Sequence, residues 1–267
     1  MTAPGPTVGE GRTSMVYAYG GDAVVKVPKP HIPDAWPALE AAFTAAVHAV
    51  GAPAPAVHDV VDVDGRPAVV FERIEGERLW DVMRQRPADR SQWMAALADL
   101  QRRVHRLGLP EGLPDLTARM RAKMGHVGRL SDDQRLDAES LVDQLPRGAA
   151  VLHGDLHPGN VIVTDDGLVA IDWFDVSVGH PLADVLRSLL LVRPLPVGTG
   201  ALHLPGADED ALTGMYHCYR DQFADLLEQE TTGWWAAMAL SRLAESAEVD
   251  GRDLWSLWDR WRTGDSS

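Results

Sequence analysis

The sequence has very little cysteine and no long apolar segment. Cys218 is the only cysteine among 267 residues, so the chain can form no intramolecular disulfide and no thiolate metal cluster. A lone thiol could still be a nucleophile, but its surroundings, MYHCYRDQ, are typical of an ordinary helix. No apolar run approaches the roughly 20 residues that a membrane span needs, and the N-terminus lacks the pattern of a secretory signal. These absences favour a cytoplasmic protein with no membrane partner.

The sequence also contains fewer basic than acidic residues. The chain carries 25 Lys and Arg residues against 39 Asp and Glu, a formal net charge of -14, and the acidic excess is concentrated toward the C-terminal end. Such a surface repels nucleic acid and anionic lipid, so we expect no nucleic-acid partner. It favours a cationic partner, although solubility alone is a common reason for an acidic surface.

The first third of the chain has the pattern of strands with one helix. Residues 14–27 form two short β-branched and aromatic runs around Gly20-Gly21-Asp22, the composition of a hairpin turn. Residues 68–74 read as another strand after the turn Asp64-Gly65. Between them, residues 36–50 have apolar side chains at helical spacing and end at Gly51-Ala52-Pro53.

The remaining chain is mostly helical. Residues 91–107 and 131–145 predict helices with Ser91 and Ser131 as N-caps, and helical sequence resumes after Pro181 with a break at residues 194–206. Short apolar runs at 149–152, 161–163 and 168–171 predict strands. We therefore expect an α+β protein of two lobes: residues 1–76 form a smaller lobe of strands and one helix, and residues 77–267 form a larger helical lobe.

One octet, HGDLHPGN at residues 153–160, is too polar and too broken for a core segment. Its alternating side chains His153, Asp155 and His157 could be zinc ligands, but no second cluster of His or Cys supplies the remaining ligands. The octet could also be a structural loop whose polar residues bond their own backbone. A third interpretation makes Asp155 a base and Asn160 a metal ligand.

The third interpretation gains from the strand that follows the octet, because it ends in Ile171-Asp172-Trp173. A carboxylate at the tip of one strand and an amide from the neighbouring loop are oxygen ligands that suit Mg²⁺, which bridges phosphates. Asp155 would then accept a proton from an attacking hydroxyl. These are the parts of a kinase catalytic loop followed by its metal aspartate.

Residues far from the octet fit a nucleotide site. Glycines 9 and 11 permit close approach of the backbone, and the hydroxyls of Thr13 and Ser14 can donate to phosphate oxygens. Lys26 stands in the run Val24-Val25-Lys26-Val27, where desolvation favours an anionic partner; an edge position facing solvent is the alternative. Glu40 on the following helix could hold the ammonium, although a solvated helix face would also explain it.

The order of these motifs resembles the aminoglycoside phosphotransferase family, the small-molecule branch of the protein-kinase-like fold. The family's catalytic loop reads His-Gly-Asp-x-x-x-x-Asn, which His153, Gly154, Asp155 and Asn160 match, and Asp172 corresponds to its metal aspartate. The resemblance extends from Gly9 to about Leu191. It implies a bilobal fold with an antiparallel sheet and one main helix in the first lobe, and ATP and Mg²⁺ as cofactors.

The resemblance also implies a role for each nucleotide-site residue. Gly9, Gly11, Thr13 and Ser14 would cover the phosphates. The side chain of Lys26 would contact the α and β phosphates and pair with Glu40. Residues 71–74 would form the hinge between the lobes, and the backbone there would bind adenine through two of its residues, Glu72 and Ile74. The downstream aspartate of the family is present as Asp184, which we interpret as structural.

The acceptor is expected to be a small molecule with a hydroxyl group. A protein substrate needs a long activation segment ending in Ala-Pro-Glu, whereas helical sequence here resumes about ten residues after Asp172. The acidic surface favours an aminoglycoside-like or other cationic acceptor; a sugar or an amino alcohol, or a nucleotide-binding module without turnover, are the alternatives. Four carboxylates could neutralise ammonium groups, unless they merely solvate the surface: Asp175, Glu228, Glu230 and Glu245.

Overall fold

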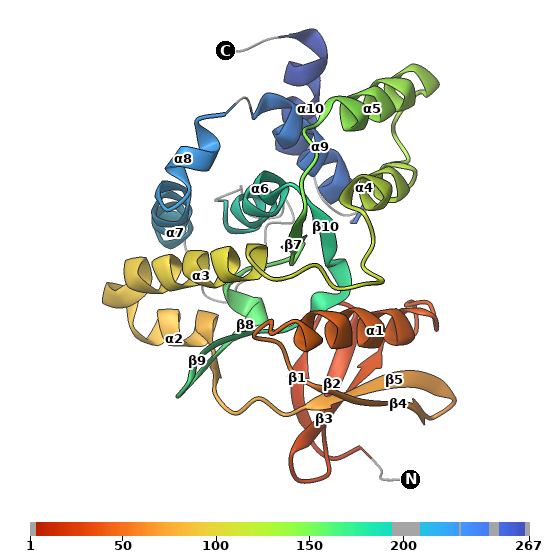
Figure 1. Cartoon of the computed structure of the whole chain (residues 1–267), viewed down its shortest axis with the longest axis vertical. Coiled ribbons are helices and arrows are strands. Elements are labelled where there is room, and N and C mark those ends of the chain that lie inside the picture. The colour runs from red at the N-terminus through yellow and green to blue at the C-terminus, as the bar shows by residue number, and fades with distance from the viewer. Residues whose placement is uncertain (1–3, 194–208, 230, 246–250, 265–267) are drawn as a thin grey trace.

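The computed structural model describes residues 4–193, 209–229, 231–245 and 251–264. It has the α+β, two-lobed architecture expected, with an antiparallel sheet and one main helix in the first lobe and a larger, mostly helical second lobe (Figure 1). Within these ranges every helix is too short or too polar to cross a membrane. The predicted break at 194–206 falls outside the described residues. The prediction that the lobes meet at residue 76 stays a prediction.

The first lobe is built on a five-stranded antiparallel sheet of order β1-β2-β3-β5-β4. The hairpin predicted around Gly20 is confirmed, and Gly20 has the positive φ of 71° that the turn requires. Helix α1 packs against β5 and β4 and lies between the sheet and the second lobe (Figure 1). The strands are β1 (Thr7–Glu10), β2 (Ser14–Tyr19), β3 (Ala23–Pro28), β4 (Val57–Val63) and β5 (Arg66–Glu72), and the helix is α1 (Trp36–Ala49).

The second lobe packs nine further helices, within the described residues, around two small sheets. Ser131 caps its helix with a full capping box, as predicted. Ser91 does not cap its helix, which begins one residue earlier with Asp89 at the N-cap. The helices are α2 (Leu79–Gln85), α3 (Arg90–His105), α4 (Leu116–Met124), α5 (Asp132–Gln144), α6 (Pro181–Val192), α7 (Glu209–Asp221), α8 (Ala224–Leu227), α9 (Thr232–Leu243) and α10 (Arg252–Thr263).

Helix α6 is the centre of the second lobe, because its residues from Leu182 to Val192 are all buried. A helix that is buried on every side is usually apolar on every side. The few polar residues of α6 therefore need hydrogen-bond partners inside the core. Asp184 and Arg187 are such residues, only 2% and 5% exposed. Both are directed into the loop that holds the octet. The core of this lobe thus carries two charged side chains directly behind the motif.

Two small sheets hold the octet in place. The octet lies between β7, in one of these sheets, and β8, in the other. The chain segment that leaves the first lobe forms β6, which pairs with β8. Gly76, just before β6, has a φ of 151°, and a Cβ there would lie 2.1 Å from the carbonyl oxygen of Val163. The strands of these sheets are β6 (Glu77–Arg78), β7 (Ala150–Leu152), β8 (Val161–Thr164), β9 (Gly167–Ala170) and β10 (Ser177–Gly179).

Candidate active site

The octet forms a loop whose main chain is held by hydrogen bonds to the side chain of Asp184. The Asp184 carboxylate accepts hydrogen bonds from the N–H groups of His153 at 3.2 Å and Gly154 at 2.7 Å, and from His105 Nε2 at 2.9 Å. Burial opposes the charge, but the hydrogen bond and charge of His105 outweigh it and lower the pKa of Asp184. The structural role inferred for Asp184 fits these contacts. The aspartate holds the main chain of the loop with a fully buried side chain.

Both histidines of the octet brace the loop. His153 Nδ1 accepts from the N–H of Asp155 at 3.3 Å, and its Nε2 lies 3.2 Å from the Ile171 carbonyl oxygen. His157 Nδ1 accepts from the Gly159 N–H at 3.0 Å. Burial lowers the pKa of His157 to about 4, although Asp155 opposes that shift. Among the residues placed by the structure, no group of three His, Cys, Asp or Glu is arranged to hold a metal ion, so the zinc interpretation has no support.

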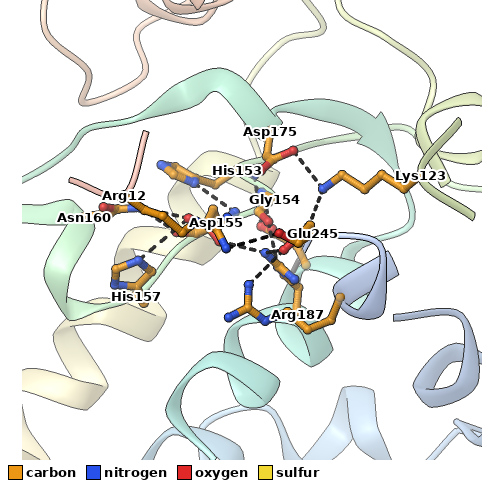
Figure 2. A network of polar contacts seen from close by, with 12 residues as sticks. Arg12, Lys123, His153, Gly154, Asp155, His157, Asn160, Asp175, Arg187 and Glu245 are labelled. Carbon is orange, nitrogen blue, oxygen red and sulfur yellow. Dashed lines mark hydrogen bonds and ion pairs between the residues drawn. The ribbon is translucent and has the colours of Figure 1, made fainter. Parts of the chain in front are cut away.

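Asp155 stands at the centre of the loop with two donors on its carboxylate. Asn160 Nδ2 donates to Oδ2 at 3.2 Å and to the main-chain oxygen of Asp155 at 3.0 Å. Arg187 Nη2 donates to Oδ1 at 3.0 Å (Figure 2). The side chain is about a quarter exposed, so it is both oriented and accessible. A carboxylate held in this way can receive a proton from a hydroxyl group within hydrogen-bond distance of it.

Lys26 and Asp172 meet across the two lobes. The Lys26 ammonium lies 2.6 Å from Glu40 Oε1 and 3.2 Å from Asp172 Oδ1. Burial opposes the charge of Lys26, but the two carboxylates outweigh it and raise the pKa of the ammonium above its ordinary value. The alternatives for Lys26 and Glu40, a solvent-facing edge and a solvated helix face, do not fit a buried ion pair.

Asn160 and Asp172 supply a donor set suited to Mg²⁺. The N–H of Ile171 donates to the main-chain oxygen of Asn160 at 2.9 Å, which places the next residue, Asp172, beside the octet. Asp172 has a left-handed backbone with φ of 65°, an uncommon conformation for a residue with a side chain. The amide nitrogen of Asn160 is engaged by Asp155, which leaves its oxygen for a metal. One carboxylate and one amide oxygen fit a hard cation that retains waters.

The segment after Asp172 locks helix α1 to the site. Phe174 stacks on Trp36 at the start of α1, with ring centroids 4.3 Å apart. Helix α1 carries Glu40, so this contact sets the position of the Lys26 partner relative to the octet. No pattern in the sequence predicts this contact, because the two aromatic residues are far apart along the chain.

The predicted phosphate-covering residues form the β1–β2 turn. Gly11 N–H donates to the Ser14 oxygen at 2.9 Å, while Gly9 lies in β1, where an added Cβ would be 2.9 Å from the Arg78 guanidinium. Thr13 is partly exposed, but Ser14 is 6% exposed, which limits the access of its hydroxyl to a ligand. Arg12 at the tip reaches the main-chain oxygen of Glu245 in the second lobe at 3.4 Å.

The predicted adenine-binding residues lie at the end of β5. The N–H of Glu72 donates to the Ala56 oxygen at 2.9 Å, and its carboxylate accepts from the Ala56 N–H at 3.0 Å. Because the Glu72 N–H is engaged, the Glu72 backbone could bind a base only by accepting a hydrogen bond with its carbonyl oxygen. Ile74 follows the strand, two residues before Gly76.

The four acidic residues predicted for acceptor binding do not gather in one place. Asp175 and Glu245 lie beside the octet, and Lys123 lies between them with a contact to each (Figure 2). Glu228 is exposed at the end of α8, which lies beside α7 in Figure 1 and outside this cluster. Glu230 falls outside the described residues. Sequence reasoning missed the cations of this cluster altogether: Arg119, Lys123, Arg187 and Arg242.

Comparison with known proteins identifies the same family of folds. The model of a phosphotransferase enzyme family matches residues 7–219. No curated protein sequence matches the chain. A choline/ethanolamine kinase family protein from Mesorhizobium loti shares 17% identity with a TM-score of 0.54, over 100% of this chain and 89% of that one.

Two solved aminoglycoside phosphotransferases show the same architecture. The aminoglycoside-3'-phosphotransferase of type VIII has a TM-score of 0.59 and 20% identity, covering 90% of each chain. The streptomycin–ATP ternary complex of APH(2'')-IIa has a TM-score of 0.54 and 14% identity, over 97% of this chain and 92% of that one. At such identities the likeness concerns the fold, which is protein-kinase-like.

Proposed function

Because this chain belongs to the phosphotransferase enzyme family, we propose that it transfers the γ-phosphoryl group of ATP to a hydroxyl of a small molecule. The observation that carries this proposal is the contact of Lys26 with Asp172 at 3.2 Å, with Asp155 on the adjoining loop. The contact brings the Lys26 ammonium of the sheet lobe beside the Asp172 carboxylate of the helical lobe. A bound triphosphate needs the ammonium for its phosphates and the carboxylate for its Mg²⁺. The ATP complex of a protein with the same fold adds support.

In this mechanism Asp155 orients the acceptor hydroxyl and takes its proton. The hydroxyl oxygen forms a bond to the γ-phosphorus as the bond from that phosphorus to the bridging oxygen of ADP breaks. Arg187 and Asn160 keep the Asp155 carboxylate in one orientation through their hydrogen bonds. Such a transfer depends on positioning and charge neutralisation more than on covalent catalysis, which accounts for a polar and bent octet.

The nucleotide is held by residues of both lobes. Lys26 contacts the α and β phosphates, the turn from Gly9 to Ser14 covers them, and the carbonyl of Glu72 with the backbone of Ile74 binds adenine. Asn160 and Asp172 would hold Mg²⁺, which neutralises phosphate charge when bound. Glu40 keeps Lys26 in place through the 2.6 Å ion pair.

The identity of the acceptor is the finer part of the proposal. The acidic surface and the aminoglycoside phosphotransferases of the same fold favour an aminoglycoside-like acceptor, and the choline/ethanolamine kinase family protein favours an amino alcohol. The local charges at the octet do not add to this argument, since Asp175 and Glu245 are already paired with cations. A nucleotide-binding module without turnover is disfavoured, because Lys26, Asp155 and Asp172 are all present.

The decisive experiment compares the wild type with Asp155→Asn and with Asp165→Asn, an exposed carboxylate in the β8–β9 turn. ATP binding is measured by calorimetry, and phosphorylated product is measured by mass spectrometry over aminoglycosides, sugars and amino alcohols. We expect Asp155→Asn to bind ATP as the wild type does and to lose transfer, while Asp165→Asn keeps both. Full transfer by Asp155→Asn would remove it from the mechanism, and absence of ATP binding by the wild type would refute the proposed function.

A further inference from the structure

The backbone of Asp172, the proposed metal ligand, has an uncommon conformation. Its φ of 65° lies in the left-handed region, which a residue with a side chain adopts only at a cost. Such a conformation persists where the surrounding structure fixes the chain on both sides of it. On the N-terminal side, the Ile171 N–H donates to the Asn160 oxygen at 2.9 Å, and the Ile171 oxygen lies 3.2 Å from His153 Nε2. The position of Asp172 therefore also depends on what holds the residues that follow it.

Arg119, on helix α4 of the second lobe, holds the residues that follow Asp172. Its guanidinium donates to the main-chain oxygen of Phe174 at 3.0 Å and to Asp175 Oδ1 at 3.1 Å. The two bonds leave from different terminal nitrogens of one planar group, so they fix the orientation of the segment as well as its position. Gly154 of the octet also packs against this segment, since a Cβ on it would lie 2.2 Å from the main-chain oxygen of Asp175. Residues 174–175 are thus in contact with both α4 and the octet.

The same guanidinium also contacts the first lobe. The Cζ atom of Arg119 lies 5.7 Å from the ring centroid of Phe43 and 5.8 Å from that of Phe174. A cation within about 6 Å of a ring centroid is attracted to the face of the ring. Phe43 belongs to α1 and lies three residues after Glu40, which places the two side chains on one side of the helix. Arg119 therefore contacts both the segment that follows Asp172 and the helix that carries Glu40.

Neutralisation of Asp175 does not by itself explain Arg119, because a second cation is already present. Lys123 Nζ lies 2.8 Å from Asp175 Oδ1, the same oxygen that Arg119 contacts (Figure 2). Lys123 lies on the same helix, one turn after Arg119. Arg119 adds the bond to the Phe174 main chain and the contacts with two rings. A lysine ammonium is a point charge without a planar fork and cannot make all of these contacts at once.

We propose that Arg119 is a positioning residue for phosphoryl transfer, which fixes the metal aspartate Asp172 and keeps helix α1 against it. This inference rests on the proposed function and adds to it a residue from outside both the catalytic loop and the nucleotide lobe. Arg119 acts through Asp172 and Glu40 rather than by touching ATP or the acceptor. Its loss should therefore weaken the use of Mg²⁺ and lower kcat, and should leave the KM for the acceptor unchanged.

The first test is the effect of Mg²⁺ on ATP binding, measured by calorimetry on the full chain with Mg²⁺ and again with EDTA. The ratio of the two affinities reports on the metal aspartate without any turnover. Arg119→Gln removes the charge and the fork, and Arg121→Gln is the matched control, because Arg121 is an exposed residue of the same helix that pairs with Asp143. We expect the ratio to fall about tenfold in Arg119→Gln and to stay within about twofold of the wild type in Arg121→Gln.

The second test is turnover with kanamycin, glucose and ethanolamine as acceptors. For each acceptor that the wild type phosphorylates, we expect the kcat of Arg119→Gln to fall about ten- to hundredfold at an unchanged KM for that acceptor. Arg119→Lys keeps a charge beside Asp175 but cannot also donate to Phe174 while it lies over the rings. Its kcat should lie between those of the wild type and Arg119→Gln. This milder variant decides the matter if Arg119→Gln does not fold.

Three results would overturn the inference. An Arg119→Gln protein with a lower Tm but with the Mg²⁺ ratio and the kcat of the wild type would make Arg119 merely structural. An Arg119→Lys protein with the kcat of the wild type would show that the fork is not needed. A higher KM for the acceptor at unchanged kcat would make Arg119 an acceptor contact.

Failure of the proposed function would look different, because the wild type itself would then bind no ATP. If the wild type binds ATP but phosphorylates none of the three acceptors, the Mg²⁺ ratio alone decides the role of Arg119.

Discussion

Asp184→Asn is the change that tests how the octet is held. The wild-type carboxylate is fully buried and accepts three hydrogen bonds, two from main-chain N–H groups of the octet and one from His105. An asparagine side chain has a single acceptor oxygen, and its NH₂ group would point at one of these donors. At least one buried N–H group therefore loses its acceptor.

The expected cost follows from those contacts. A buried N–H without an acceptor costs about 1–3 kcal/mol, and the remaining bonds lose the assistance of a full negative charge, about 1 kcal/mol more. We therefore expect the free energy of unfolding to fall by about 3 kcal/mol. For a chain of this length that corresponds to a decrease in Tm of about 5–10 °C. Because Gly154 lies next to Asp155, kcat should fall as well.

Thermal unfolding followed by circular dichroism measures the change in Tm, and product formation measures the change in kcat. Asp99→Asn is a matched control, since Asp99 is an exposed carboxylate that pairs with Arg102 one helical turn away. Its Tm should stay within about 1 °C of the wild type. An Asp184→Asn protein that melts together with the Asp99→Asn protein would show that the octet does not depend on this anchor.

Three further changes test the site. Gly154→Ala should lower the free energy of unfolding by about 2 kcal/mol or more and reduce phosphoryl transfer. The reason is that the φ of residue 154 is 80° and the new Cβ would lie 2.2 Å from the main-chain oxygen of Asp175. A variant with the Tm and the turnover of the wild type would contradict this. Lys26→Met should weaken ATP binding by calorimetry about tenfold or more, and unchanged affinity would contradict it. Burial lowers the pKa of His157 in the folded protein to about 4, against an ordinary value of 6.5. Between these two pH values the unfolded state therefore binds more protons than the folded state. The free energy of unfolding is highest above pH 6.5 and decreases as the pH falls to 4. In urea titrations with EDTA, His157→Gln should lack this loss of up to about 3 kcal/mol; equal slopes for both proteins would contradict it.

Local signals made much of the fold predictable. The glycine turn at Gly20, the capping residue Ser131 and the polar octet each act within a few residues, so the sequence shows them directly. The prediction of Ser91 as an N-cap was wrong, because a 3-10 turn at Pro87–Asp89 runs straight into α3 and moves its start. Strand β4 was not predicted, because three exposed polar residues, His58, Asp59 and Asp62, interrupt its valines.

The charge pattern of the site could not be read from the sequence. Asp175 stood out because it follows Asp172 closely, but its partner Arg119 lies 56 residues earlier. Arg187 sits in an apolar helix and joins Asp155 and Glu245, which are 32 and 58 residues away. Only the packing of α4, α6 and α9 brings these side chains together. The acidic residues predicted from the sequence are therefore only one partner of each ion pair.

The close packing of Gly76 against Val163 limits where the chain between the lobes could bend when product is released. The chain between the lobes does not run free there, since Gly76 packs against the Val163 carbonyl and Glu77–Arg78 are paired with β8. Strand β8 begins directly after Asn160. If the lobes part, we expect the chain to bend between residue 73, which is bonded to Asp22, and Gly76, because a bend further on would disturb the pairing beside Asn160, the proposed metal ligand.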